Sequence, residues 1–173
     1  MELYEAINKR RSVRDFLDKD VEDEKIFRIL EAAIKAPSAG NLQPWEFVLV
    51  RDEKNKRELA KAALNQNFIY EAPVVIVVCA DKERSGSRYG SRGRELYCIQ
   101  DTAAATMTLM LAAVAEGLGT CWVGAFHEEE VRKVINAPKN VRPLAIVPVG
   151  YPSRDGYRTG RYDLESVLHK ESF

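Results

Sequence analysis

The chain has 173 residues, and its 26 lysines and arginines balance its 26 aspartates and glutamates, so the formal net charge is zero with both histidines neutral. That balance excludes the chain-wide positive charge with which non-specific nucleic-acid binders displace counterions, and we expect no nucleic-acid partner. A composition that is 46% apolar and 30% charged is typical of a globular protein and excludes a disordered one. At this length we expect one domain, residues 1–173, with a sizeable core.

The sequence also predicts a cytoplasmic protein without a membrane segment. Residues 1–5 are acidic, where a signal peptide would be basic and then apolar. The longest uncharged run, residues 102–115, is shorter than the roughly 20 apolar residues that a membrane span needs. The cysteines are odd in number and widely spaced, which fits the reduced thiols of the cytosol: Cys79, Cys98 and Cys121.

Hydrophobic periodicity and helix-end signals predict five elements in the first half of the chain. We expect helices over residues 2–9, 22–36 and 52–64, and strands over residues 47–50 and 74–78. The second strand is apolar throughout, so we expect it at the centre of the sheet.

In the second half, residues 81–94 carry no core pattern and predict a mobile loop that could cover a binding site. The helix expected next, residues 95–116, is apolar almost all round in its uncharged part, which predicts burial, in part against a partner subunit. Short strands are expected over 120–123 and 144–149, with a helix over 128–136 between them. On pattern alone, this alternation of strands and helices favours a parallel, doubly wound sheet.

Two basic clusters are candidates for binding a phosphate. The first combines three guanidinium groups with a hydroxyl: Arg10, Arg11, Ser12 and Arg14. Such donors suit a phosphate, although the arginines could instead complement the dipole of the preceding helix and remain solvated. The second cluster is by default a solvated tail: Arg154, Arg158 and Arg161. Together, however, the two clusters could hold one phosphate from both ends of the chain.

Residues 37–45 combine small residues with the side-chain amides of Asn41 and Gln43. Small residues allow close backbone approach, and amides can read the alternating donors and acceptors of a planar heterocycle. Taken alone, the segment could equally be a loop that terminates a helix, because Pro and Gly punctuate any loop.

Other chemistry finds little support. Residues 117–124 contain glycines, but their spacing does not match a dinucleotide fingerprint. His127 and His169 stand alone and no metal or hydrolase motif is present, so we expect no metal. Cys121 lies in an apolar strand, where a packed thiol is favoured over a nucleophile.

Taken together and in this order, these segments resemble the nitroreductase family of flavin-dependent oxidoreductases. The resemblance spans most of the chain. Its two main motifs are Arg10-Arg11-Ser12-Val13-Arg14-Asp15-Phe16 and Pro37-Ser38-Ala39-Gly40-Asn41-Leu42-Gln43-Pro44-Trp45. Support comes from Ala72-Pro73, from residues 117–124, and from Val149-Gly150-Tyr151-Pro152 with the basic tail that follows.

The resemblance implies an α+β fold, a three-layer α/β/α sandwich with a mainly antiparallel central sheet. It also implies a homodimer that binds flavin mononucleotide (FMN) at each of two subunit interfaces. This contradicts the parallel sheet that pattern alone favours. We follow the resemblance, because several matched motifs constrain a fold more strongly than alternation does.

The resemblance further implies which residues bind FMN, and it implies no catalytic side chain. Those expected at the phosphate and ribityl chain are Arg10, Arg11, Ser12, Arg158 and Arg161. Arg14 would lie near the pyrimidine edge, where a fixed cation stabilises the anionic reduced ring. The other subunit would contribute Ser38, Ala39, Asn41 and Gln43. Candidates for the ring edge are Gln66 and Asn67, and candidates for backbone contacts to the ring face are Val123 and Gly124.

The activity implied is ping-pong hydride transfer from NADH or NADPH through FMN to a small-molecule acceptor such as a nitroaromatic, a quinone or a free flavin. Two alternatives remain open. The chain could be a specialised family member that dehalogenates, dehydrogenates or fragments the flavin. It could also be a non-enzymatic FMN-binding protein, because no nicotinamide fingerprint is evident.

Overall fold

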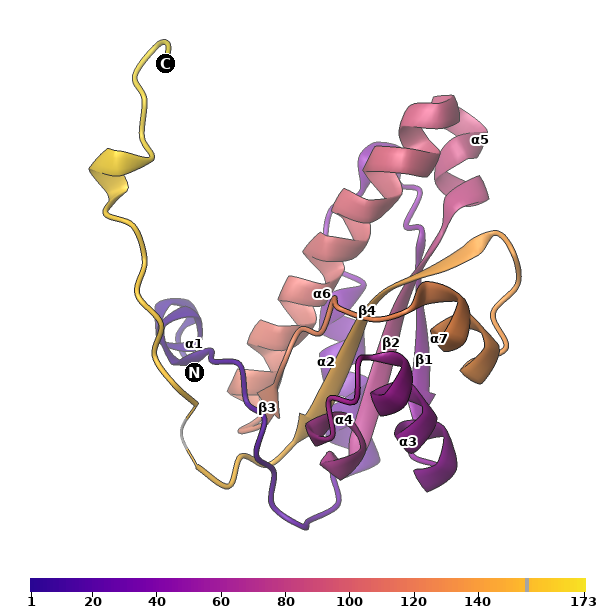
Figure 1. The fold of residues 1–173 in the computed structure, drawn as a ribbon. Helices are drawn as coiled ribbons and strands as arrows, with labels where there is room; N and C mark the ends of the chain where they lie inside the picture. Colours follow the sequence, from indigo (N-terminus) through magenta and orange to yellow (C-terminus); the bar gives the residue numbers. More distant parts are fainter. Residues whose placement is uncertain (155) are drawn as a thin grey trace.

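A computed structural model describes residues 1–154 and 156–173 and shows a central sheet between two layers of helices (Figure 1). In chain order the elements are α1 (Leu3–Lys9), α2 (Asp23–Ala33), η1 (Ala39–Asn41), β1 (Trp45–Val50), α3 (Glu53–Ala62), α4 (Phe68–Glu71), β2 (Val74–Asp81), α5 (Lys82–Arg92), η2 (Gly93–Tyr97), α6 (Cys98–Ala115), β3 (Gly119–Thr120), α7 (Glu128–Val134), β4 (Val141–Gly150) and η3 (Leu164–Ser166).

The sheet has four strands in the order β1-β2-β4-β3, and every neighbouring pair is antiparallel. The antiparallel α+β fold expected from the family resemblance is therefore confirmed, and the parallel sheet favoured by pattern alone is wrong. The alternation of strands and helices along the chain does not determine strand direction. A helix can connect two parallel strands or two antiparallel strands, and the order of elements is the same in both cases. As predicted, β2 is central, and Val77 pairs with both Val48 and Ile146.

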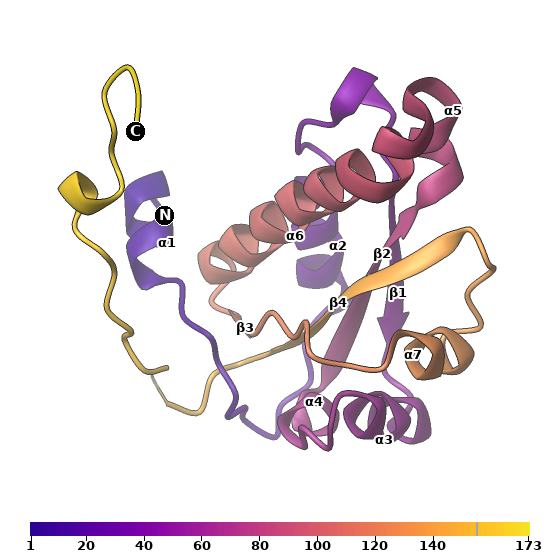
Figure 2. The same ribbon diagram turned by 45° about the horizontal axis from the view of Figure 1, so that its top comes forward.

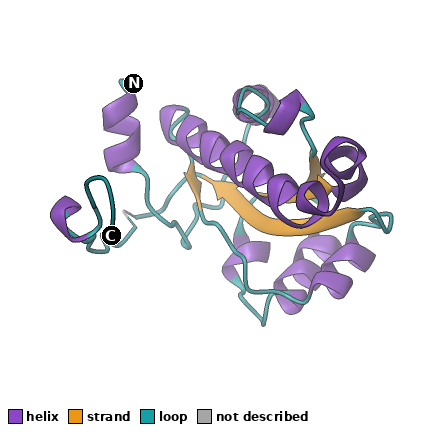
Figure 3. Ribbon diagram, turned by 90° about the horizontal axis from the view of Figure 1, so that it is seen from above, coloured by secondary structure: helices purple, strands orange, loops and turns teal. Residues whose placement is uncertain are grey.

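Helices cover both faces of the sheet (Figure 3), and residues of β2 alternate between two cores, one on each face. On one face, Val74, Ile76 and Val78 pack with residues of α2 and α6, among them Ile29 and Leu109. On the other, Val75, Val77 and Cys79 pack with Leu59 of α3, Ile69 of α4 and Val131 of α7. Burial on both faces accounts for the continuous apolar run in the sequence.

The helical stretch Lys82–Ala115 is long and apolar enough, by length and composition alone, to cross a membrane. Its α6 part instead packs on the sheet, where Leu109, Met110 and Ala113 join the core beside α2. The apolar composition of α6 therefore reflects its position in the core. Met107, on another side of the helix, is 38% exposed.

The loop predicted over residues 81–94 is wrong, because Asp81 ends β2 and residues 82–94 form α5 and the start of η2. The Asp81 side chain caps α5 by accepting hydrogen bonds from the backbone N–H groups of Glu83 and Arg84, at 3.0 and 3.2 Å. The chain reverses at Gly90, whose φ of +58° favours glycine. Arg94 then pairs with Glu83 at 2.7 Å, so α5 and η2 form a helical hairpin held by polar contacts.

The two ends of the chain project from the sandwich on the side away from α3 and α7 (Figures 1 and 2). In α1 only Ala6 is buried. The tail that follows β4 exposes large apolar side chains, among them Tyr157, Tyr162, Leu164 and Leu168. Within one chain, these side chains have no core to enter.

Candidate functional site

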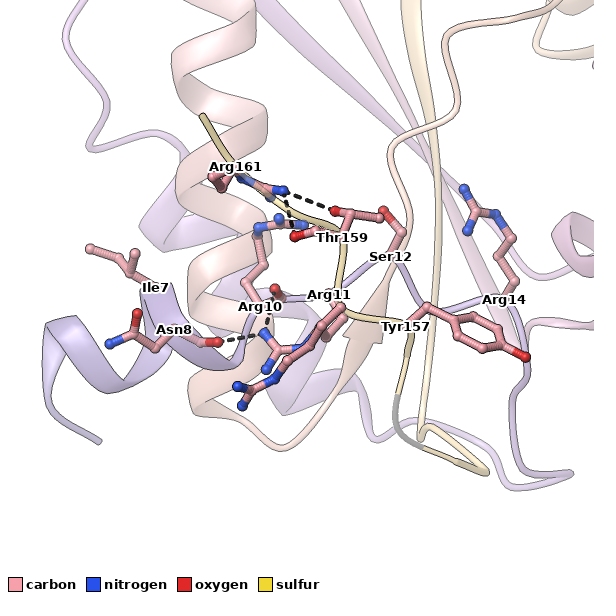
Figure 4. Close-up of a pocket in the computed structure, with 10 residues that line it drawn as sticks. Ile7, Asn8, Arg10, Arg11, Ser12, Arg14, Tyr157, Thr159 and Arg161 are labelled. Carbon is pink, nitrogen blue, oxygen red and sulfur yellow. Dashed lines mark hydrogen bonds between the residues drawn. The ribbon is translucent and has the colours of Figure 1, made fainter. Parts of the chain in front are cut away.

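Residues of both basic clusters of the sequence, though not Arg154, line one cavity of about 450 Å³ between the end of α1 and the tail. The predicted residues that line it are Arg10, Arg11, Ser12, Arg14, Arg158 and Arg161, together with Tyr157 and Thr159. In Figure 4, the side chains of Arg10, Arg11 and Arg161 gather on one side, and Arg14 lies beyond Tyr157.

Backbone contacts fix the N-terminal wall of this cavity. The segment after α1 runs beside β3, where Ser12 and Thr120 form a parallel bridge and the Val13 N–H donates to the Thr120 carbonyl at 2.9 Å. The tail approaches closely at Gly156, where an added Cβ would lie 2.8 Å from Arg11 Cβ and 3.0 Å from the Ser12 carbonyl oxygen. Only glycine allows the tail to pass here without displacing the arginine wall.

The cavity is strongly cationic. Within residues 1–154 and 156–173, none of its arginines forms an ion pair with a carboxylate. Among the residues that the structure describes, Arg161 donates only to the Thr159 hydroxyl at 2.9 Å and to the Thr159 and Gly160 carbonyls, and Arg11 donates only to the carbonyls of Asn8 and Arg10. Nearby Arg154, by contrast, is paired with Asp15 at 2.8 Å. Uncompensated guanidinium groups around one cavity fit the dianionic phosphate of FMN.

Arg14 connects the cavity to the predicted ring-edge residues. Its guanidinium lies 5.6 Å from the ring centre of Phe68, the residue that follows Asn67. Gln66 donates through Nε2 to the carbonyls of Ala63 and Ala125, at 2.9 and 3.3 Å. The stretch around Gln66 is therefore tied to the segment that contains Gly124.

The backbone of Val123 is already engaged. Its N–H and C=O both pair with Ile146, each at 3.0 Å, and its side chain is buried. The Gly124 N–H donates to no other backbone group within the described residues, and Gly124 is exposed. Of the two backbone contacts expected from the resemblance, Gly124 is the one whose N–H remains available.

The remaining predicted residues do not reach this cavity within one chain. Ser38, Ala39, Asn41 and Gln43 lie in and around η1, which contacts the first turn of α6 through a 3.0 Å hydrogen bond from the Ala39 N–H to Asp101. The cavity instead adjoins β3, beyond the last turn of α6. At about 1.5 Å per residue, the intervening helix separates the two groups by about 20 Å.

Sequence reasoning missed Asp101, the acidic residue that positions this loop. Asp101 is 7% exposed, its Oδ1 accepts the Ala39 N–H, and its buried Oδ2 has no partner within the described residues. Burial raises the pKa of this carboxyl above the usual value, and the hydrogen bond from Ala39 partly opposes that rise. The sequence signal was a single acidic residue at the start of an otherwise apolar helix.

The cysteines carry no sign of nucleophilic chemistry. Cys79, Cys98 and Cys121 are free and buried. Burial raises the pKa of the Cys79 thiol to about 12 and also raises that of Cys121, so both remain protonated at neutral pH. Within residues 1–154 and 156–173, no three His, Cys, Asp or Glu side chains form a group that could hold a metal ion.

Comparison with known proteins gives consistent matches over nearly the whole chain. Residues 7–68 and 61–151 match the model of the Nitroreductase family. A protein of Archaeoglobus fulgidus with the provisional name NADH dehydrogenase/NAD(P)H nitroreductase is 35% identical over 99% of both chains. An FMN reductase [NAD(P)H] of Bacillus subtilis is 29% identical over 99% of this chain and 74% of its own.

A solved structure shares the architecture. It is a nitroreductase family protein from Streptococcus pneumoniae, with a TM-score of 0.90 and 26% identity over 98% of this chain and 100% of the other.

Proposed function

Because the chain belongs to the nitroreductase family, we propose that it is an FMN-dependent oxidoreductase that takes its electrons from NADH or NADPH. The observation that carries the proposal is the convergence of arginines from both ends of the chain on one cavity, where none of them has a carboxylate partner among the described residues. The names of relatives support both cofactors, since they include an FMN reductase [NAD(P)H] and an NADH dehydrogenase of Thermus thermophilus.

In this proposal, the chain's own residues bind and orient the cofactor. Arg10, Arg11 and Arg161, with Ser12 and Arg158, would hold the phosphate and ribityl chain. Arg14 would stand near the pyrimidine edge, where its fixed positive charge favours electron uptake by the ring. Gln66 and Asn67 would meet the ring edge, and the Gly124 N–H would face the ring. When bound, FMN supplies the hydride chemistry, so no side chain is needed as acid or base.

We further propose that the active form is a homodimer. Ser38, Ala39, Asn41 and Gln43 lie about 20 Å along α6 from the arginine cavity, so one chain cannot bring both groups to one flavin. A second copy can provide the missing group. The exposed apolar side chains of α1 and of the tail fit burial in such an interface.

The acceptors that fit this proposal are small molecules such as nitroaromatics, quinones and free flavins, reduced after the donor has left. Three buried free thiols fit a cytoplasmic enzyme. A dehalogenating, dehydrogenating or flavin-fragmenting role would use the same cavity. One relative, from Thermotoga neapolitana, is named iodotyrosine deiodinase and is 29% identical over 87% of this chain.

The first experiment is to purify the protein without added cofactor, record its visible absorption spectrum and identify any chromophore that heat releases. We expect FMN at about one per chain. A colourless protein that also fails to bind added FMN would contradict the assignment of the cavity.

The second experiment separates an enzyme from a flavin carrier. Anaerobic stopped-flow mixing with NADH or NADPH should bleach the bound flavin faster than free FMN. If neither donor accelerates bleaching while FMN remains bound, the chain is a flavin-binding protein and the reductase proposal is wrong.

A further inference from the structure

The α5–η2 hairpin carries a cluster of cations and aromatic rings that the proposed FMN site does not use. The Arg88 guanidinium lies 5.5 Å from the ring centre of Tyr89, and the Arg92 guanidinium lies 5.2 Å from that of Tyr97. The two rings meet edge to face at 5.1 Å, and Arg92 Nε donates to the Tyr97 hydroxyl at 2.9 Å. These four side chains, here called the hairpin cluster, form one connected surface.

The arginines of the hairpin divide into two kinds. Arg84 pairs with Glu46 and Asp81, and Arg94 pairs with Glu83 at 2.7 Å. Arg88 and Arg92 are exposed and form no ion pair with a carboxylate anywhere in residues 1–154 and 156–173. A tyrosine ring holds each of these two guanidinium groups in place without neutralising its charge. Their N–H groups therefore remain able to bind an anion.

The hairpin cluster lies against the loop that would enter the partner's flavin site. A Cβ added at Gly40 would lie 2.6 Å from the Tyr89 hydroxyl and 3.0 Å from Arg88 Nη1. Gly40 stands between Ala39 and Asn41, which are expected to contact the flavin. Whatever binds at the hairpin cluster would thus extend outward from the rim of that site.

We propose that Arg88 and Arg92 bind the 2′-phosphate of NADPH and make it the preferred electron donor. This inference rests on the proposed function, because it requires a pyridine dinucleotide whose nicotinamide reaches the flavin. The ADP half of that molecule then extends to the rim. A 2′-phosphate is a monoester that approaches two negative charges at neutral pH, and it matches the hairpin cluster, whose two guanidinium groups form no ion pair with a carboxylate within the described residues.

Charge distinguishes this phosphate from the pyrophosphate that both donors share. Each pyrophosphate phosphorus carries a single negative charge, whereas the monoester concentrates its charge on one group that only NADPH has. Arginine near the adenosine ribose is also the residue that commonly accommodates a 2′-phosphate.

The test is a binding measurement on the flavin-loaded protein, with 2′,5′-ADP and 5′-AMP as probes. We expect 2′,5′-ADP to bind at least about tenfold more tightly than 5′-AMP, because charged hydrogen bonds are the strong ones. In Arg88→Ala/Arg92→Ala that preference should vanish, and Arg88→Lys/Arg92→Lys should retain part of it. The matched control is Lys54→Ala/Lys139→Ala, which also removes two exposed cations.

Steady-state kinetics completes the test. In Arg88→Ala/Arg92→Ala, KM for NADPH should rise at least about tenfold while KM for NADH changes less than threefold. An equal rise in KM for both donors would place the pyrophosphate at the hairpin cluster and overturn the proposal. Unchanged KM values for both donors would also overturn it. If neither donor reduces the flavin, the proposed function fails, and the 2′,5′-ADP measurement still decides whether the cluster binds this phosphate.

Discussion

Arg10 and Arg161 illustrate that the site is assembled from segments far apart in the sequence. They lie near opposite ends of the sequence, yet they line the same cavity. Gathering like charges without carboxylates raises the electrostatic free energy of the empty protein. A bound phosphate offsets that repulsion, so the arrangement is best explained by an anionic ligand.

Replacing Arg10 or Arg161 with alanine should weaken FMN binding by about 1.5 to 3 kcal/mol each, the range for hydrogen bonds that involve a charged group. Equilibrium titration of apoprotein with FMN measures this change. Arg154→Ala is the control, because the Arg154 charge is already compensated by Asp15 and both side chains are largely exposed. Unchanged affinity in both test variants would mean that the clusters are solvated surface.

The burial of Asp101 predicts that the stability of the protein depends on pH. Its carboxyl has a raised pKa in the folded protein, so folding favours its protonated form. The stability that protonated Asp101 contributes is therefore fully present below the pKa that this carboxyl has in the unfolded chain. It is lost as the pH rises through the pKa that the carboxyl has in the folded protein. Asp101→Asn cannot titrate, and its side-chain oxygen can still accept the Ala39 N–H.

Urea unfolding at about pH 3.5, near the ordinary pKa of aspartate, and at pH 7 tests this expectation. Relative to the wild type, Asp101→Asn should gain stability between the lower and the higher pH. Asp18→Asn serves as the control because it removes an exposed carboxylate. The same stability difference at both pH values would show that burial of Asp101 is not linked to its titration.

At the scale of elements, the sequence predicted the helices with strong periodicity well. The helix expected over residues 22–36 occupies Asp23–Ala33, and the one expected over 52–64 occupies Glu53–Ala62 with Asp52 as its cap. Both show apolar residues on one face and a recognisable N-terminal signal. The local hydrophobic pattern is sufficient to predict a helix that buries one apolar face against the sheet.

The α5–η2 hairpin could not be predicted in the same way. Its stability comes from the Asp81 cap, the Glu83–Arg94 pair and a close backbone approach, none of which has an apolar period. The direction of the strands escaped local reasoning too, because it depends on which elements become neighbours. Likewise, sequence spacing alone could not place Ser38 and Arg10 at opposite ends of α6.

Gly93→Ala should destabilise the protein by about 1 to 3 kcal/mol, the usual cost of overpacking. A Cβ at this position would lie 2.3 Å from the Ser85 carbonyl oxygen, which is backbone and cannot rotate away. Chemical denaturation would measure the loss. At Gly160 an added Cβ meets nothing within 4 Å, so Gly160→Ala should leave stability within about 0.5 kcal/mol of the wild type. A stable Gly93→Ala variant would mean that α5 and η2 separate without cost.

At the scale of the whole molecule, assembly and cofactor binding should be coupled. In the tail, Leu164 and Leu168 are 65% and 51% exposed, so both leave apolar surface in contact with water. Their burial against a second copy would stabilise a dimer through the hydrophobic effect. The dimer would in turn bring the 38–43 loop of one copy to the arginines of the other.

Leu164→Asp/Leu168→Asp should therefore dissociate the dimer at micromolar concentration and weaken FMN binding at least about tenfold in the same variant. Light scattering after size exclusion and a flavin titration would measure the two effects. Leu17→Asp, which alters an exposed leucine outside the tail, is the control. A monomer that retains wild-type flavin affinity would contradict the coupling.

The cavity also bears on how the protein matures during synthesis. Its first wall, around Arg10 to Arg14, leaves the ribosome early, whereas its second wall ends at Arg161. The ligand site therefore cannot form while only the sandwich part of the nascent chain has left the ribosome. Chains that stop after β4 could fold their core and still lack half of the cationic wall, so ligand occupancy would report that translation had passed the tail.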